Sequence, residues 1–346
     1  MFSKIKNKLE KELPRFLADI NKQYGLTKIS PLLFRRIREF ALRDGKRIRP
    51  ALFVIGYLGF AKKPAPRLYT SALALELLHD FMLVHDDIID KSATRRGRPS
   101  LHVILDNYLA GLKGVRFSGQ DLAIVAGDVM YAIGIHAFLQ VKENQARKEA
   151  ALKKFIEAAI YTGSGEFIEL LAGLKDIADI SKDEIYRIYD YKTACYSFAS
   201  PLSSGAILAG ASGKEAEKLF DCGIYLGRAF QIKDDILGTF GNDKKIGKST
   251  LTDLKESKKT IILWQAFQRG GHKEKTLIKR VLAKKKVGMK DLRQIREIMI
   301  GTGALDYAEQ EISFLINKAA GIIASSSMKK QYRLWLRQYS NKLLEA

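Results

Sequence analysis

Cysteine is scarce in this chain. Its 346 residues include two cysteines, Cys195 and Cys222, so the sequence holds no disulfide framework. This excludes a small secreted domain stapled by disulfides and fits a reducing compartment. We therefore predict a cytoplasmic location.

Long uncharged runs are also scarce. Charged residues recur from Lys4 onward, so no signal-peptide-like apolar stretch is present at the N-terminus. The longest uncharged run, Thr193 to Gly213, approaches the roughly 20 apolar residues that span a bilayer. It contains five serines, three glycines and Pro201. We expect a buried helix lined by small residues and no transmembrane segment, and we leave peripheral membrane contact open.

Acidic residues are outnumbered, 38 against 59 basic ones, which gives a formal charge of +21. Such an excess attracts anions, including nucleic acid, anionic membranes and polyphosphate substrates. No basic cluster interleaves both glycines and aromatics as RNA-binding segments do. These clusters are Lys4 to Lys11, Lys273 to Lys290 and Lys329 to Arg337. We predict no nucleic-acid partner and assign most lysines to a solvated surface.

Proline is absent after Pro201, which favours long helices because proline interrupts a helix interior. Alternation of period two is rare, so strands are not expected. Ser30 before Pro31 predicts a helix start, and Lys62 to Arg67 and Gly210 to Gly213 predict loops. We predict one all-α domain over residues 1–346, a helical bundle around a central cavity. Its long helices are Leu68 to Leu83, Leu122 to Gln140, Ala146 to Leu174, Lys182 to Leu208 and Lys214 to Leu237.

Two aspartate clusters each follow a long apolar segment. In the first, His85-Asp86-Asp87-Ile88-Ile89-Asp90, the side chains of Asp86 and Asp90 share one helix face. Adjacent carboxylates repel, and a divalent cation such as magnesium relieves the repulsion. A solvated acidic helix end is the alternative for one such cluster alone. The second cluster contains Asp234 and Asp235, and two pairs together predict metal ions that bridge the oxygens of a diphosphate.

Basic blocks frame the first cluster. Gly45-Lys46-Arg47-Ile48-Arg49-Pro50 contains three cations, and Arg95-Arg96-Gly97-Arg98 follows the aspartates after a short loop. Arginine binds phosphate with two hydrogen bonds, and lysine supplies a point charge. Each block alone is more often surface than site, but together with a metal-type triplet they predict a diphosphate site.

The successive blocks GKRIRP, HDDIIDKSATRRGRPSLH, GDVMY, KTACYSF and FQIKDDILGTFGNDKKIGKSTLTDLKESKKT resemble those of the trans-prenyl diphosphate synthases, or polyprenyl synthetases. The resemblance is clearest from Gly45 to Thr260. It implies condensation of isopentenyl diphosphate with an allylic diphosphate (dimethylallyl, geranyl or farnesyl) by a homodimer. It also implies two or three magnesium ions, bound by Asp86 and Asp90 with Asp87 in support, and by Asp234 with Asp235 nearby.

The resemblance further implies a role for each matching residue in substrate binding and ionisation. The matches to positions that hold isopentenyl diphosphate are Lys46, Arg49, His79 and Arg96. The matches to positions that hold the allylic diphosphate are Arg95, Lys192, Lys248 and Lys258. The matches to groups lining the developing positive charge are Thr193, Tyr196 and Gln231. Taken singly, His79 or Tyr196 is equally explained as a core residue.

The sequence departs from the family pattern at Gly238, where the second motif commonly ends in aspartate, and this weakens the expectation of three ligands there. Phe81 and Met82, five and four residues before Asp86, predict product length. At 1.5 Å per residue they lie roughly 6–8 Å from Asp86 along the helix axis. A rigid phenyl ring there predicts a C20 product, with C15 next, and packing of Phe81 in the core is the alternative.

Other functions share parts of this pattern. A terpene cyclase or head-to-head synthase shares the aspartate motifs, but a cyclase needs no second diphosphate site. A phosphohydrolase of the His-Asp type needs more metal-binding histidines, and this chain has five in all. A non-catalytic regulatory subunit of the same fold is expected to lose aspartates, and both pairs are present.

Overall fold

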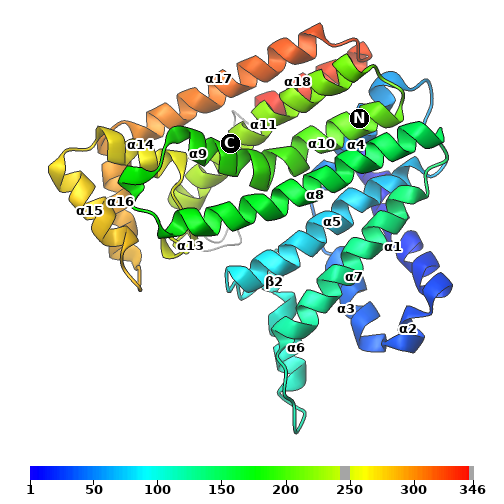
Figure 1. Cartoon of the computed structure of the whole chain (residues 1–346), viewed down its shortest axis with the longest axis horizontal. Coiled ribbons are helices and arrows are strands. Elements are labelled where there is room, and N and C mark those ends of the chain that lie inside the picture. Colours follow the sequence, from blue (N-terminus) through cyan, green and yellow to red (C-terminus); the bar gives the residue numbers. More distant parts are fainter. Residues whose placement is uncertain (242–249, 343–346) are drawn as a thin grey trace. The chain divides into compact units, whose positions relative to one another are not determined.

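The computed structural model describes residues 1–241 and 250–342, and these are almost entirely helical (Figure 1). The chain groups into two compact units. The first is formed by Met1–Lys153 and Ser204–Ala211, and the second by Lys154–Ser203 and Ser212–Ala346. The predicted all-α fold is confirmed. The single domain over residues 1–346 stays a prediction, and each unit is described separately below.

The first unit contains the N-terminal helices and one short hairpin. Its elements are α1 (Phe2–Tyr24), α2 (Leu26–Ile29), α3 (Pro31–Ala41), α4 (Ile48–Phe60), α5 (Leu68–Ile89), β1 (Thr94–Arg95), β2 (Arg98–Pro99), α6 (Leu101–Leu109) and α7 (Gly119–Leu139). Helices α5 and α7 lie side by side and make the most extensive contact of this unit. Because α5 is apolar on nearly all sides, it is buried along most of its length and ends with the first aspartate cluster.

The second unit contains the remaining described helices. Helix α8 (Gln145–Leu174) begins in the first unit and continues here. Helix α10 (Ser200–Leu208) begins here and continues into the first unit from Ser204. The others are η1 (Ile177–Asp179), α9 (Lys182–Tyr189), η2 (Asp190–Ala199), α11 (Gly213–Phe240), α13 (Thr252–Lys255), α14 (Ile261–Arg269), α15 (His272–Leu282), α16 (Met289–Gly301), α17 (Ala304–Ser325) and α18 (Lys330–Lys342). Helix α11 packs against both α17 and η2, and its last turns carry the second aspartate cluster.

The local signals explain several helix boundaries. The Ser30 hydroxyl accepts a hydrogen bond from the Leu33 amide at 3.3 Å, and Pro31 occupies the first helical position, as the sequence predicts. Ser181 and Glu184 form a reciprocal capping box at the start of α9. The expected loop at Lys62 to Arg67 is confirmed as the connection that precedes α5, and the loop expected at Gly210 to Gly213 ends one residue earlier, because Gly213 begins α11.

The structure differs from the expected absence of strands at one place. Thr94 pairs with Pro99 and Arg95 with Arg98 in a two-residue antiparallel ladder. The two residues of the turn, Arg96 and Gly97, both have positive φ, 55° and 70°. Two left-handed residues in a row are typical of a tight hairpin whose twist matches its strands. The ladder is too short to produce an alternating pattern, so periodicity could not reveal it.

Among the described helices, α7 alone is long and apolar enough to cross a membrane by length and composition. A core helix of a globular protein passes the same test, and α7 packs along α5 and α6. The run from Thr193 to Gly213, which the sequence marks as the longest uncharged stretch, forms the end of η2, all of α10 and the loop before α11.

Candidate active site

The first aspartate cluster lies at the C-terminal end of α5, where its three carboxylates face different surroundings. Asp87 is fully buried, whereas Asp86 and Asp90 are half-buried. This follows from the helix geometry, since Asp86 and Asp90 share a face and Asp87 lies about 100° away. Burial raises the pKa of Asp87 above its ordinary range, although the charge of Arg95 works in the opposite direction. Asp86 and Asp90 are therefore the carboxylates of this cluster that are accessible to a metal ion.

Arg95, in strand β1, connects the hairpin to the aspartates. Its Nε donates to Asp87 Oδ1 at 2.6 Å, and its Nη2 lies 3.1 Å from Asp86 Oδ2. The following residue, Arg96, occupies the turn and is directed to different acids, Glu76 and Asp80 of α5, at 3.7 and 3.8 Å. The hairpin thus separates two adjacent arginines, which the sequence analysis assigns to different substrates.

The other basic block, at the start of α4, contains one structural arginine and two accessible cations. Arg47 is buried and donates hydrogen bonds to Glu76, to Glu10 and to two backbone carbonyls, one at the end of α3 and one in the loop that follows it. Lys46 is exposed and Arg49 is half-buried, so these two remain the candidates for binding an anion. The role that the resemblance implies for Lys46 and Arg49 stays a prediction.

His79 lies on α5 between Glu76 and Asp80. Burial, together with the positive charges of Arg49 and Arg96, holds the pKa of His79 well below its ordinary value. The imidazole is therefore neutral at neutral pH. In the role predicted for it, His79 would contact a diphosphate through a hydrogen bond and not as a charge.

In the second unit, the predicted residues Lys192, Thr193 and Tyr196 lie on η2, a segment with π-helical hydrogen bonding. Such wide turns occur mostly as short insertions in α-helices, often at functional sites. Lys192 Nζ lies 2.6 Å from Glu166 Oε2 and also pairs with Glu169, both on α8. These two glutamates could not be singled out from the sequence, because acidic residues are frequent on a solvated helix face.

A hydrogen-bond chain connects η2 to the second aspartate cluster. Thr193 Oγ1 donates to Gln231 Oε1 at 2.7 Å, and Gln231 Nε2 donates to Asp235 Oδ1 at 2.8 Å. Tyr189 donates its hydroxyl proton to the other oxygen of Asp235 and accepts from the amide of Ile261. Burial, and then the negative charge of Asp253, raise the pKa of Asp235 well above its ordinary range. Asp235 is thus a buried member of this network, whereas Asp234 is exposed.

The structure also accounts for Gly238. A Cβ atom at this position would lie 2.6 Å from Asp253 Oδ2. The space beside Gly238 is therefore occupied by a carboxylate from α13, which also lies 3.9 Å from the ammonium group of Lys258. Lys258 makes a closer pair with Glu256 at 2.7 Å. The predicted site residue Lys248 falls outside the described residues.

Small residues allow α11 to approach η2 closely. A Cβ atom at Gly227 would lie 2.3 Å from the Cα of Ala194, next to Thr193. We expect Gly227→Ala to lower the free energy of unfolding by about 1–2 kcal/mol, because overpacking costs more than the higher helix propensity of alanine returns. Denaturant unfolding measures the change.

The matched control is Gly321→Ala in α17. Nothing lies within 4 Å of a Cβ atom at Gly321, so alanine there should stabilise the protein by up to about 1 kcal/mol. Equal effects of the two substitutions would contradict the close approach of α11 to η2.

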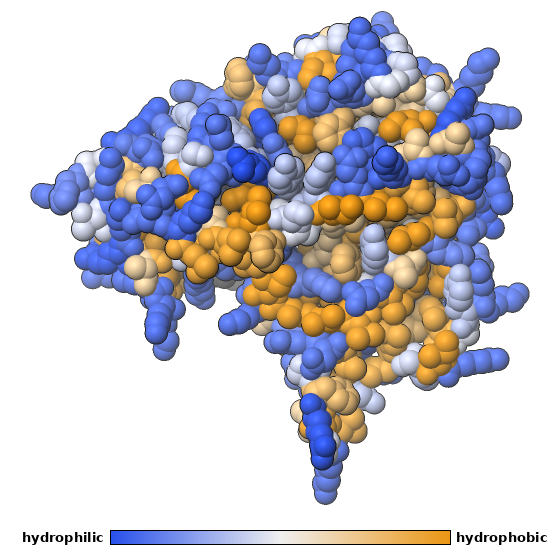
Figure 2. Space-filling view, in the orientation of Figure 1, coloured by the Kyte–Doolittle hydropathy of each residue, from blue (hydrophilic) through white to orange (hydrophobic). Residues whose placement is uncertain are grey.

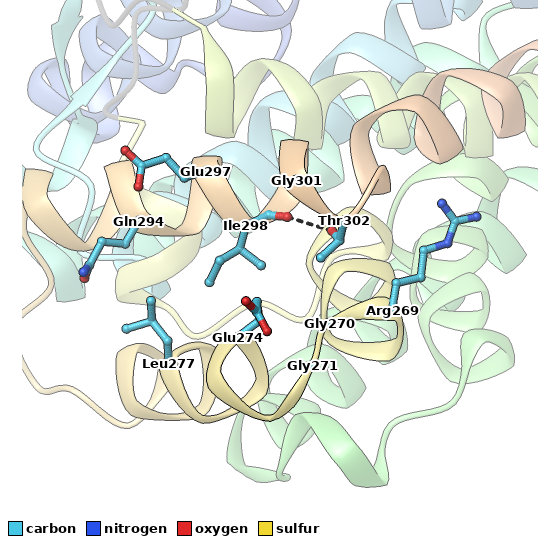
Figure 3. A pocket seen from close by; sticks show the side chains of 10 residues that line it. All are labelled: Arg269, Gly270, Gly271, Glu274, Leu277, Gln294, Glu297, Ile298, Gly301 and Thr302. Carbon is cyan, nitrogen blue, oxygen red and sulfur yellow. Dashed lines mark hydrogen bonds between the residues drawn. The ribbon is translucent and has the colours of Figure 1, made fainter.

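A separate cleft of about 640 Å³ lies among α14, α15 and α16 (Figure 3). Figure 3 shows Glu274 and Ile298 on opposite sides of the cleft, and the Thr302 hydroxyl donates to the Ile298 carbonyl at 2.7 Å. None of the site residues predicted from the sequence lines this cleft. It lies in the part of the chain where the motif blocks have ended.

Comparison with known proteins agrees with the resemblance seen in the motifs. The family model described as polyprenyl synthetase matches residues 30–299. A geranylgeranyl diphosphate synthase of Sulfolobus acidocaldarius is 32% identical over 299 residues, which cover 86% of this chain and 85% of that relative. A geranylfarnesyl diphosphate synthase of Aeropyrum pernix is 33% identical over 286 residues, with 81% and 83% coverage.

Among solved structures, a geranylgeranyl pyrophosphate synthase from Corynebacterium glutamicum, complexed with isoprenyl diphosphate and magnesium, matches with a TM-score of 0.89 and 27% identity. The match covers 100% of this chain and 99% of that one. The alternatives of a terpene cyclase and a non-catalytic subunit are not favoured, because these relatives carry the names of synthases. The chain thus belongs to the polyprenyl synthetase family and is a trans-prenyltransferase, as its aspartate and arginine blocks indicate.

Proposed function

We propose that this chain condenses isopentenyl diphosphate head to tail with an allylic diphosphate and releases a C20 prenyl diphosphate. The observation that carries the proposal is the end of α5. There, two accessible carboxylates suited to a hard cation lie beside arginines that a tight hairpin presents. A diphosphate substrate requires both kinds of group, because its charge is neutralised by metal ions and by guanidinium groups.

The site residues fall into three groups. Lys46, Arg49, His79 and Arg96 of the first unit hold isopentenyl diphosphate. Arg95, Lys192, Lys248 and Lys258 hold the allylic diphosphate. Thr193, Tyr196 and Gln231 line the place where positive charge develops. The network from Thr193 to Asp235 supports the third group, since it fixes the orientation of the Gln231 amide and the Thr193 hydroxyl.

The carboxylates fit the proposed magnesium ions in their chemistry. Asp86, Asp90 and Asp234 offer accessible oxygen atoms, which hard divalent cations prefer. Asp87 and Asp235 are buried and bonded to protein donors, so they orient their neighbours. When bound, two or three magnesium ions would neutralise the charge of the diphosphate as it leaves.

The reaction begins when the allylic C–O bond breaks and the electron pair leaves with the diphosphate. Lys192, Lys258 and Arg95 stabilise the departing charge. The double bond of isopentenyl diphosphate attacks the allylic cation to form the new C–C bond, and the departing diphosphate accepts the proton that is then lost. Exclusion of water is essential, because water would convert the cation to an alcohol.

Product length in this proposal is limited by an aromatic wall in the first unit. The ring of Phe81 lies 4.6 Å from that of His85 and 5.3 Å from that of Tyr131 on α7, measured between centroids. Phe81 and Met82 are half-buried, so both can meet a tail that runs along α5. Tyr131 could not be predicted from the spacing to Asp86, because it lies on another helix, 50 positions after Phe81 in the chain.

The direct test is a product assay. Purified protein is incubated with labelled isopentenyl diphosphate, magnesium and dimethylallyl, geranyl or farnesyl diphosphate, and the dephosphorylated products are identified by mass. We expect a C20 product from each primer. If folded protein catalyses no condensation with any primer, the proposed reaction is wrong. A dominant product of C30 or longer would refute the proposal that the aromatic wall limits product length.

We also propose a cytoplasmic homodimer that folds as one domain. Helix α8 supports the dimer, because six of its exposed apolar side chains lie on one helical face, with steps of three, four or seven residues and with Leu170 and Leu171 adjacent. They are Ile156, Ile160, Phe167, Leu170, Leu171 and Leu174. Hydrophobic surface is also visible along α8 in Figure 2. A continuous apolar stripe of this length is typical of a protein interface.

Light scattering tests the dimer. We expect the wild-type protein to have the mass of two chains and Phe167→Glu to shift it toward one, because a charge on the stripe must be desolvated in the interface. The control is Phe314→Glu on α17, an exposed phenylalanine outside the stripe, which should leave the mass unchanged. A wild-type mass of one chain at assay concentration, with full activity, would exclude the dimer.

A further inference from the structure

Two buried acids interrupt the apolar surface of α5. Glu76 and Asp80 are four residues apart, so they share one face, and their side chains are 3% and 0% exposed. Burying two carboxylates side by side is costly unless cations lie close to them. Neither acid belongs to the aspartate clusters, and neither has a role in the reaction described above.

Glu76 connects the two basic blocks of the first unit. Its Oε1 atom lies 2.5 Å from Arg47 Nη1 and 3.7 Å from Arg96 Nη2. Arg47 is fixed by further bonds to Glu10 and to the carbonyls of Ala41 and Arg43. Arg47 is therefore a structural anchor, and its partner Glu76 is held in place by it.

Arg96 is held differently. Asp80 Oδ1 lies 3.8 Å from its Nη2, beyond hydrogen-bonding distance, and its side chain is 21% exposed. Within the described part of the chain, its Nη1 has no hydrogen-bond partner. The two acids thus attract the guanidinium group by charge without forming hydrogen bonds with it.

Asp80 depends on the same arginines. Burial raises the pKa of Asp80 well above its ordinary range, and the charge of Glu76 adds to this, whereas Arg96, Arg47 and Arg49 work in the opposite direction. The two oxygens of Asp80 have no hydrogen-bond partner among the described residues. Arg96 is thus the arginine that lies nearest to the Asp80 carboxyl group among its ion-pair partners, at 3.8 Å and without a hydrogen bond.

We infer that Asp80 is a positioning residue: from its buried place on α5 it holds the Arg96 guanidinium where the diphosphate of isopentenyl diphosphate binds. This inference rests on the proposed function, which assigns Arg96 to that substrate. Glu76, which Arg47 holds in place, is the second acid near the Arg96 guanidinium. Asp80 acts on the substrate only through Arg96 and does not contact the substrate itself.

The test is Asp80→Asn, which keeps the shape of the side chain and removes its charge. We expect the KM for isopentenyl diphosphate to rise about five- to tenfold, a modest coupling between two groups. The kcat and the KM for the allylic primer should stay within about twofold of wild type, within the error of such context-dependent effects. A purely structural role would instead lower kcat and the kcat/KM values for both substrates together. Asp44→Asn is the matched control, because Asp44 is exposed and carries the same charge near the same basic block.

A double-mutant cycle separates the inference from the proposed function. Arg96→Ala should itself raise the KM for isopentenyl diphosphate, and Asp80→Asn should have no further effect in that background. If Arg96→Ala leaves this KM unchanged, the proposed assignment of Arg96 is wrong. Two other outcomes would show that Asp80 does not act through Arg96. In both, Arg96→Ala raises the KM for isopentenyl diphosphate. In the first, Asp80→Asn has no effect on this KM, and in the second it has the same effect with and without Arg96. Asp80→Ala replaces Asp80→Asn in the cycle if the asparagine variant does not fold.

Discussion

Asp86→Ala should reduce kcat by about 10²–10³-fold, the loss that follows removal of one preorganised charge-stabilising group. Asp86 is the half-buried carboxylate of the first cluster that shares a helix face with Asp90 and also contacts Arg95. Its removal takes away a proposed metal ligand and leaves Arg95 with Asp87 alone. Steady-state kinetics at saturating substrate measure the change, and manganese binding followed by electron spin resonance reports the metal directly.

Asp19→Ala is the control for this variant, because Asp19 is exposed on α1 and belongs to no motif. It should leave both kcat and manganese binding unchanged. Asp234→Ala should resemble Asp86→Ala, since Asp234 is the accessible acid of the second cluster. Near-normal turnover in either folded variant would remove metal-assisted departure of the diphosphate from the mechanism.

Phe81→Ala should shift the main product beyond C20 while the rate of each condensation changes little. The phenyl ring of Phe81 lies against the rings of both His85 and Tyr131, and its removal leaves space beside α5 for further isoprene units. Tyr131 remains in this variant, so we expect a limited extension. Phe81→Ala combined with Tyr131→Ala should give longer chains than either change alone. Product masses from time courses with farnesyl diphosphate measure the distribution.

The control here is Phe117→Ala, an exposed phenylalanine of the first unit that lies before α7. Its product distribution should equal that of the wild type. If Phe81→Ala is folded and active and also keeps the wild-type distribution, Phe81 is a packing residue and chain length is limited elsewhere.

The helices and the motif blocks were accessible from the sequence. The run of helix-favouring residues in α5, the capping serines and the absence of proline after Pro201 are local signals, and local signals determine where helices begin and end. The two aspartate clusters follow from the same reasoning, because residues four apart share a helix face whatever surrounds the helix. The family was therefore recognisable before any tertiary structure was known.

Only the tertiary structure determines which of several similar residues is structural and which is accessible to a ligand. Arg47 and Arg49 are equivalent in the sequence, yet Arg47 is fixed by Glu10 and Glu76, which lie 37 positions before it and 29 after it. Asp86 and Asp87 are neighbours, yet only Asp87 is buried against Arg95. Likewise, Gly238 stands in the sequence where a ligand is commonly found, and in the structure Asp253 of α13 occupies the space beside it. A side chain's partners come from segments far away in the chain, so sequence spacing fixes the face a residue occupies, while packing decides what that face meets.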